Sequence, residues 1–184
     1  MAYQQNTYAF FTYLRENKSV RDQIKAAPGK TLLYAGSFNG PIWKELERLK
    51  RTDPAYANKE TLADVLGQLP SHIPAHSNLF ASVNAVVAGV PPDPDGFHIW
   101  RALSGIFAAN ASGQVSFSLG RDVAKVVNAS GHGVAKGSSV FAATEIHVLA
   151  RNRNLDPVTK EIVEYMLRSI RAGKADLNFG YIAG

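Results

Sequence analysis

The sequence contains no cysteine, which excludes disulfide frameworks, zinc-thiolate sites and thiol chemistry. It also lacks any run of about 18 apolar residues, and its N-terminus opens with the polar stretch MAYQQNT rather than with a basic segment followed by an apolar one. Internal repeats and low-complexity tracts are absent as well. We therefore expect a soluble chain, with no membrane segment, whose fold depends on ordinary core packing.

What the sequence does contain is enough apolar material for one domain and an excess of positive charge. The 184 residues are 46% hydrophobic and carry a formal net charge of +5, which favours an anionic partner such as nucleic acid or a phosphorylated metabolite. The charges are not clustered, because KELERLKR (44–51) and KEIVEYMLRSIRAGK (160–174) mix both signs at helical spacing. Such stretches are typical of solvated helix faces, so we do not expect a nucleic-acid interface.

Apolar periodicity and turn residues predict helices first, and then alternating strands and helices. The predicted helices cover 7–17, 20–26, 42–50, 60–69, 97–111 and 158–173, the predicted strands cover 31–36, 114–119 and 138–149, and 78–89 fits either. The segment VPPDPDG (90–96) marks a boundary. We predict one α/β domain over residues 1–184, with a mainly helical lobe in 1–90. The α/β lobe in 97–184 would hold a small, largely parallel sheet flanked by helices.

Two stretches look like familiar motifs without matching them. GHGVAKGSS (131–139) has glycines and a lysine but not the spacing of a phosphate-binding loop, and it reads as a mobile loop. HIPAH (72–76) has two histidines four residues apart, but Pro74 between them spoils a helical metal-binding face. We therefore expect no metal site and no bound cofactor.

Glu145 lies inside the apolar run SSVFAATEIHVL, which we predict as a strand. A carboxylate on the buried side of a strand costs several kcal/mol unless it is paired, hydrogen-bonded or protonated. Strand alternation could turn Glu145 to solvent, or an arginine could neutralise it. Alternatively, the carboxylate has a catalytic function. The sequence around Glu145 alone does not decide between these interpretations.

Trp100 and Ser104 are four residues apart on the helix predicted over 97–111, so they share one face. A tryptophan on an apolar stripe usually belongs to a core. Here, however, this helix is followed by small residues, a strand and then S-x-F-x-x-x-E-x-H-x-L, and this order resembles the ADP-ribosyl cyclase family, which includes NAD glycohydrolases. The positions that carry the motif are Ser139, Phe141, Glu145, His147 and Leu149.

Upstream segments extend the resemblance to about residues 31–150. LLYAG resembles the family's apolar strand that ends in an aromatic pocket wall, usually tryptophan, so Tyr34 is the counterpart. TLADVLG resembles the family's T-L-E-D-T-L-x-G stretch, with Ala63 in place of an acid that helps to govern cyclisation against hydrolysis. The strand also departs from the family at Ala35 and Gly36. The missing disulfides suit a bacterial or intracellular relative.

The resemblance implies an NAD(P)⁺ glycohydrolase that releases nicotinamide and ADP-ribose, with cyclisation as a side reaction. Glu145 and Ser104 would be catalytic, and Trp100, Tyr34 and Phe141 would bind the substrate. Because such an activity would deplete the NAD of its own host, we further expect a bacterial toxin domain. It would be secreted by a dedicated system to act in the target-cell cytoplasm, with a cognate immunity protein as partner. The alternatives are a nucleic-acid-binding module or ribonuclease toxin, and a catalytically dead nucleotide-binding relative.

Overall fold

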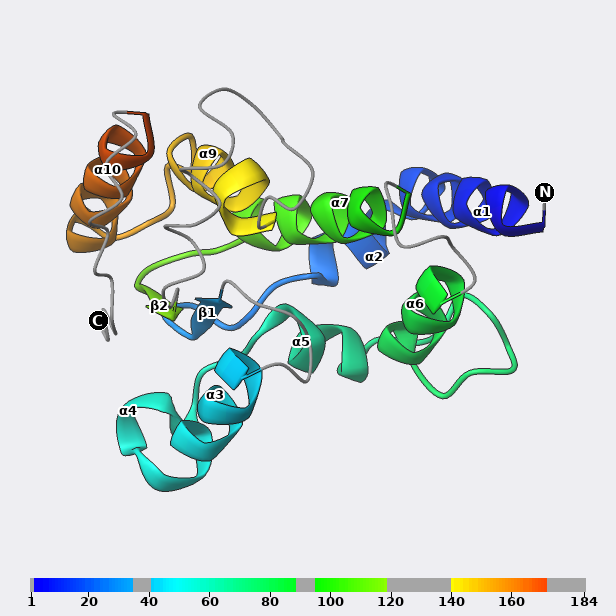
Figure 1. Ribbon diagram of the computed structural model, residues 1–184, viewed down its shortest axis with the longest axis horizontal. Helices are drawn as coiled ribbons and strands as arrows, with labels where there is room; N and C mark the ends of the chain where they lie inside the picture. The colour runs from blue at the N-terminus through cyan, green and yellow to red at the C-terminus, as the bar shows by residue number, and fades with distance from the viewer. Residues whose placement is uncertain (1, 35–40, 89–94, 119–139, 172–184) are drawn as a thin grey trace.

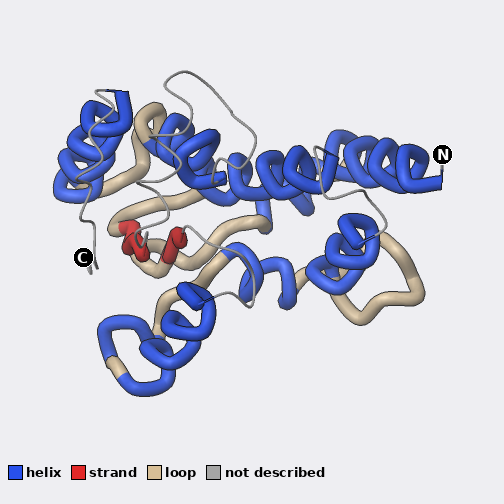
Figure 2. The backbone as a smooth tube through the Cα atoms, viewed as in Figure 1, coloured by secondary structure: helices blue, strands red, loops and turns tan. Residues whose placement is uncertain are grey.

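The computed structural model describes residues 2–34, 41–88, 95–118 and 140–171, and the coloured ribbon in Figure 1 traces them. Within these ranges the chain forms nine α-helices, one π-helical turn and a two-stranded parallel sheet. Helix dominates, as the blue segments in Figure 2 show. The mixed α/β class that the sequence predicts is therefore confirmed. No helix in the described ranges is long and apolar enough to cross a membrane.

The helices are α1 (Ala2–Glu16), α2 (Lys18–Gln23), α3 (Pro41–Thr52), α4 (Pro54–Ala57), α5 (Leu62–Gln68), α6 (Leu79–Ala88), α7 (Asp95–Ala109), α9 (Ile146–Leu149) and α10 (Pro157–Arg171), and the π-helical turn is η1 (Phe141–Glu145). Each of the six predicted helices is present, whereas α4 was not predicted, and η1 and α9 fall in a stretch predicted as a strand. The ambiguous stretch 78–89 is thus a helix, α6. Pro41 occupies the first turn of α3, where its missing N–H costs nothing.

The sheet joins two distant parts of the chain. Strand β1 (Thr31–Tyr34) pairs in parallel with β2 (Val115–Ser118), and the register sets Leu33 beside Phe117 and Tyr34 beside Ser118. Both strands, and their parallel pairing, agree with the sequence prediction. Because β1 comes from the segment assigned to the helical lobe, the sheet links the two lobes. Most of the boundary at 90–96 lies outside the described residues.

The third predicted strand, over 138–149, is wrong: its described part is helical, with η1 running directly into α9. Three of its buried side chains, Phe141, Glu145 and Leu149, are spaced by four residues, which is a helical stripe. The prediction followed the β-branched residues at even positions, which imitate strand alternation. Packing of this stripe against α7 outweighs their weak preference for a strand.

Two hydrophobic clusters lie on opposite faces of the sheet. Leu33 and Phe117 belong to the large cluster, to which α1, α5, α6, α7, η1, α9 and α10 also contribute buried residues. Leu32 belongs to the small cluster, with Leu46 of α3, Tyr56 of α4 and the partly buried Tyr34 packed against it. Neighbouring residues of a strand point to opposite faces, which explains how β1 serves both clusters. In Figure 1, α7 runs through the middle of the molecule, and α3 and α4 lie at its edge below the sheet.

Candidate active site

Glu145 is the last residue of η1 and is only 5% exposed. Burial raises the pKa of its carboxyl from about 4.5 to about 8, and a hydrogen bond from the Ser104 side chain opposes part of this rise. The acid therefore neither turns to solvent nor lies on a strand. Short π-helical turns are rare and occur frequently at functional sites.

Helix α7 brings Ser104 to this carboxyl because α7 and η1 pack directly against each other. Ser104 is 6% exposed, so its hydroxyl meets Glu145 in a dry environment. One turn away, the Arg101 Nε donates a hydrogen bond of 2.9 Å to the Thr144 Oγ1. Gly105 lies at the same contact, where a Cβ would lie 3.4 Å from the Thr144 Cγ2, in ordinary van der Waals contact.

Tyr34 ends β1 and lies within electrostatic reach of the same carboxyl. Burial raises the pKa of its phenol above the ordinary value, and the negative charges of Glu145, Asp64 and Glu47 raise it further. The carboxyl ends of parallel strands are common ligand-binding edges. The structure thus brings together Glu145, Ser104 and Tyr34, which come from three elements distant in sequence.

Ser118, which no sequence motif indicated, ends β2 directly beside Tyr34 in the register. Its side chain is 6% exposed and provides a buried hydroxyl at the same edge of the sheet. Ser118 stands between Phe117 and Leu119 near the end of a predicted parallel strand, and this position could have indicated a role at the edge of the sheet. A hydroxyl there is suited to a polar part of a ligand, such as a sugar hydroxyl.

Phe141 lies inside the large hydrophobic cluster, whereas Trp100 lies at its edge. Phe141 is 1% exposed and packs edge-on against Phe117 with the ring centroids 6.0 Å apart, so it supports η1 from within the large cluster. Trp100 is half-buried at the edge of that cluster, 6.3 Å from the ring of Phe80. It shares the α7 face with Ser104, whereas Tyr34 packs against the small cluster. The Trp100 and Tyr34 rings would therefore approach a ligand from different sides.

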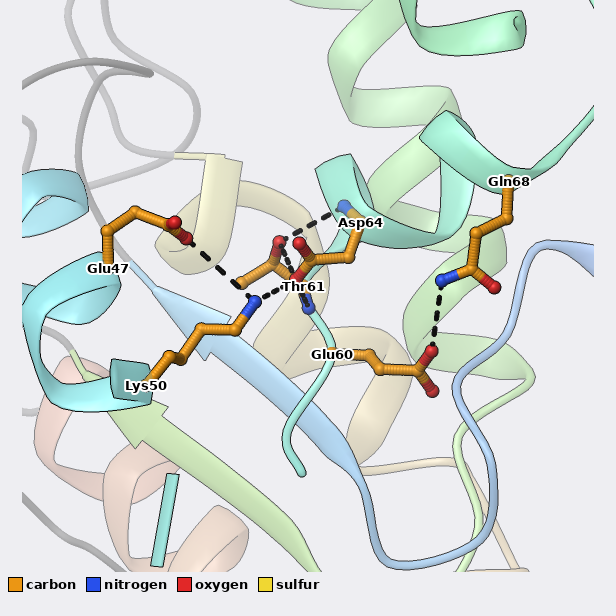
Figure 3. A network of polar contacts seen from close by, with 6 residues as sticks. All are labelled: Glu47, Lys50, Glu60, Thr61, Asp64 and Gln68. Atoms are coloured by element: carbon orange, nitrogen blue, oxygen red, sulfur yellow. Dashed lines mark hydrogen bonds and ion pairs between the residues drawn. The ribbon is translucent and has the colours of Figure 1, made fainter. Parts of the chain in front are cut away.

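The T-L-A-D stretch begins α5 with a capping box. The Thr61 hydroxyl accepts from the Asp64 N–H, and the Asp64 carboxylate accepts from the Thr61 N–H at 2.8 Å. Lys50 of α3 reaches the Asp64 carboxylate at 2.7 Å and Glu47 at 3.8 Å, as Figure 3 shows. Ala63 is half-buried beside this network.

Several predicted features lie outside the described residues, namely Ser139, Ala35, Gly36 and the glycine-rich stretch 131–137. Among the described side chains, no group of three or more His, Asp or Glu residues could hold a metal ion.

The chain was compared with known proteins at three levels. No model of a protein family, no curated protein and no solved structure matches it. A function for this chain is therefore inferred from the site geometry and from the sequence motifs alone.

Proposed function

We propose that this protein is an NAD(P)⁺ glycohydrolase with an ADP-ribosyl cyclase-like fold. One observation carries the proposal: Glu145 is a buried carboxyl, hydrogen-bonded by Ser104, on a π-helical turn near the carboxyl edge of a parallel sheet. The motif around Glu145 and the Trp100 and Ser104 pair support the same assignment.

The reaction breaks the bond between the nicotinamide nitrogen and the anomeric carbon of the ribose. The bonding electron pair leaves with nicotinamide, and positive charge develops on the anomeric carbon before water adds and releases a proton. A negative charge beside that carbon stabilises the transition state more than the ground state. The Glu145 carboxylate supplies this charge, and low dielectric around it strengthens the interaction.

The raised pKa of Glu145 fits a cationic substrate. In the free protein the carboxyl holds its proton at neutral pH, because burial raises its pKa to about 8. The pyridinium ring of NAD⁺ carries a positive charge, and a nearby cation favours the ionised acid. Substrate binding would thus release the proton and generate the catalytic carboxylate, while the Ser104 hydrogen bond holds it in place.

The ratio of hydrolysis to cyclisation depends on how easily water enters the pocket. Cyclisation requires the adenine to reach the anomeric carbon before water does. Ala63, where the resembled family has an acid, offers only a methyl group to influence this competition. We therefore propose ADP-ribose and nicotinamide as the main products, with cyclic ADP-ribose as a minor one.

The biological role that we propose is that of a bacterial toxin domain that depletes NAD(P)⁺ in a target cell. In the producing cell, an immunity protein would neutralise it. The reasoning is chemical: a hydrolase of this kind consumes a cofactor that every cell needs.

The test combines two measurements on the purified protein. An etheno analogue of NAD⁺ becomes more fluorescent when its nicotinamide bond is cleaved, so the proposal predicts a steady rise in emission. Chromatography of a reaction with NAD⁺ should then show nicotinamide and ADP-ribose in excess over cyclic ADP-ribose. An absence of turnover with both NAD⁺ and NADP⁺ would contradict the proposal, and a predominantly cyclic product would contradict only the product assignment.

A further inference from the structure

Trp43 lies next to the candidate site, although no sequence motif indicates a function for this residue. It lies in the first turns of α3, is half-buried, and packs its ring against Tyr34 with the centroids 5.7 Å apart and the planes at 53°. Tyr34 in turn lies within electrostatic reach of Glu145. The two rings therefore form a corner at the carboxyl end of β1.

Three carboxyl groups lie near this corner, and one of them, Glu145, is protonated in the free protein and ionises when a cation binds. The carboxylates of Glu145, Asp64 and Glu47 all act on the Tyr34 phenol. Glu47 follows Trp43 by four residues and so lies on the same face of α3. Lys50, one turn further along that face, is ion-paired with both Glu47 and Asp64, and a single cation offsets one of these two charges (Figure 3).

Aromatic faces combined with nearby carboxylates are a recognition surface for a flat cation. The face of an indole carries partial negative charge and attracts a cation, most strongly where water is excluded. A pyridinium ring is planar and positively charged, whereas free nicotinamide has the same shape but no charge. The corner should thus hold the ring before cleavage and release it afterwards.

We propose that Trp43, together with Tyr34, binds the pyridinium ring of the oxidised dinucleotide, with Trp43 as the stacking surface. This inference rests on the proposed function and adds a substrate-binding residue to it. Because the positive charge leaves the ring as the bond breaks, Trp43 stabilises the bound ground state at least as much as the transition state. Its loss should raise KM and leave kcat nearly unchanged.

Kinetics of two variants test the role of Trp43. Trp43→Ala should raise KM for NAD⁺ by about 10-fold or more, with kcat within about 3-fold of wild type. The KM of Trp43→Phe should lie between the KM of wild type and that of Trp43→Ala. A KM for Trp43→Ala within about 2-fold of wild type would overturn the inference. If the wild-type protein releases no nicotinamide at all, it is the proposed function that fails.

Fluorescence gives a readout that a purely structural tryptophan would not move. The chain has two tryptophans, so the emission that wild type has in excess of a Trp43→Phe variant comes from Trp43, and Trp100 stays in place in both proteins. We expect 1-methylnicotinamide, a pyridinium that lacks the scissile ribose bond, to quench this emission saturably, and neutral nicotinamide to quench it far less. Equal quenching by the two probes, or none by either, would overturn the inference without any reference to turnover.

Discussion

Glu145 is held where ionisation is unfavourable, and this should be visible in the stability of the protein. Its pKa in the folded state, about 8, exceeds the ordinary value near 4.5. The folded state therefore binds the proton more tightly than the unfolded state does between these two values. The stability that this provides is fully present below pH 4.5 and is lost as the pH rises through about 8.

Glu145→Gln should remove this pH dependence because the amide stays neutral. We expect the variant to melt at least about 5 °C above wild type at pH 9, and close to wild type at pH 4.5. Thermal melting followed by circular dichroism measures both. Glu161→Gln, which changes an exposed residue of α10, is the matched control and should track wild type throughout. Parallel melting curves for the Glu145 variant and wild type across this range would show that the buried carboxyl is not protonated.

Trp100 offers a second test at the residue scale, because ligand stacking and core packing predict different phenotypes. Its half-buried position at the cluster edge leads us to expect that Trp100→Phe keeps most of the stability and loses about 10-fold or more in kcat/KM. Phe107→Leu, at a fully buried position of the same helix, should instead lose about 1 kcal/mol and keep its activity per folded molecule. The opposite pattern would make Trp100 a core residue.

At the scale of elements, the close packing of α7 against η1 sets the geometry of the site. The alternating β-branched residues of 138–149 predicted a strand, and only the spacing of Phe141, Glu145 and Leu149 indicated a helix. Local pattern was ambiguous there, and contact with α7 decided it. The motifs nevertheless singled out Glu145 and Ser104, which the structure brings together, because side-chain identity does not depend on the secondary structure assigned to it.

Gly105 tests how much this packing matters. Its absent Cβ would lie 3.4 Å from the Thr144 Cγ2, in ordinary contact. Gly105→Ala should therefore be tolerated and gain up to about 1 kcal/mol from its better helix propensity. Gly105→Val adds methyl groups that push η1 away, and should cost about 1–3 kcal/mol and about 10-fold in turnover. Thermal melting and the etheno-NAD⁺ assay measure both effects, and equal activity of the two variants would show that η1 tolerates displacement.

At the scale of the whole molecule, the sheet and its flanking turn tie distant segments together. Gly113, with φ of +69°, accepts a hydrogen bond from the Asp156 N–H at 3.1 Å and donates one to the Asn154 carbonyl at 2.9 Å. A Cβ on it would lie 3.2 Å from the Gly29 nitrogen, so glycine permits this close approach. The turn before β2 thus joins the segments before β1 and before α10.

These long-range relations explain what the sequence could and could not predict. Helix α10 and strands β1 and β2 follow from local apolar patterns, and they agree with the structure. Ser118 and Trp43 were missed, because their relevance comes only from the neighbours that the fold gives them: Tyr34 in the sheet register for Ser118, and the Tyr34 ring for Trp43.

In the proposed mechanism, the buried Glu145 carboxylate promotes cleavage of the nicotinamide bond of NAD(P)⁺ by stabilising the positive charge on the anomeric carbon. The most direct measurement is nicotinamide release at pH 8.5, followed by chromatography, for wild type, Glu145→Gln and the exposed control Glu161→Gln, each shown to be folded. Wild type and the control should release nicotinamide at similar rates. Glu145→Gln should be slower by about 100-fold or more, which corresponds to a loss of about 3 kcal/mol of transition-state stabilisation. A Glu145→Gln rate within about 3-fold of wild type would exclude Glu145 from the mechanism, and no release by wild type would contradict the proposed function.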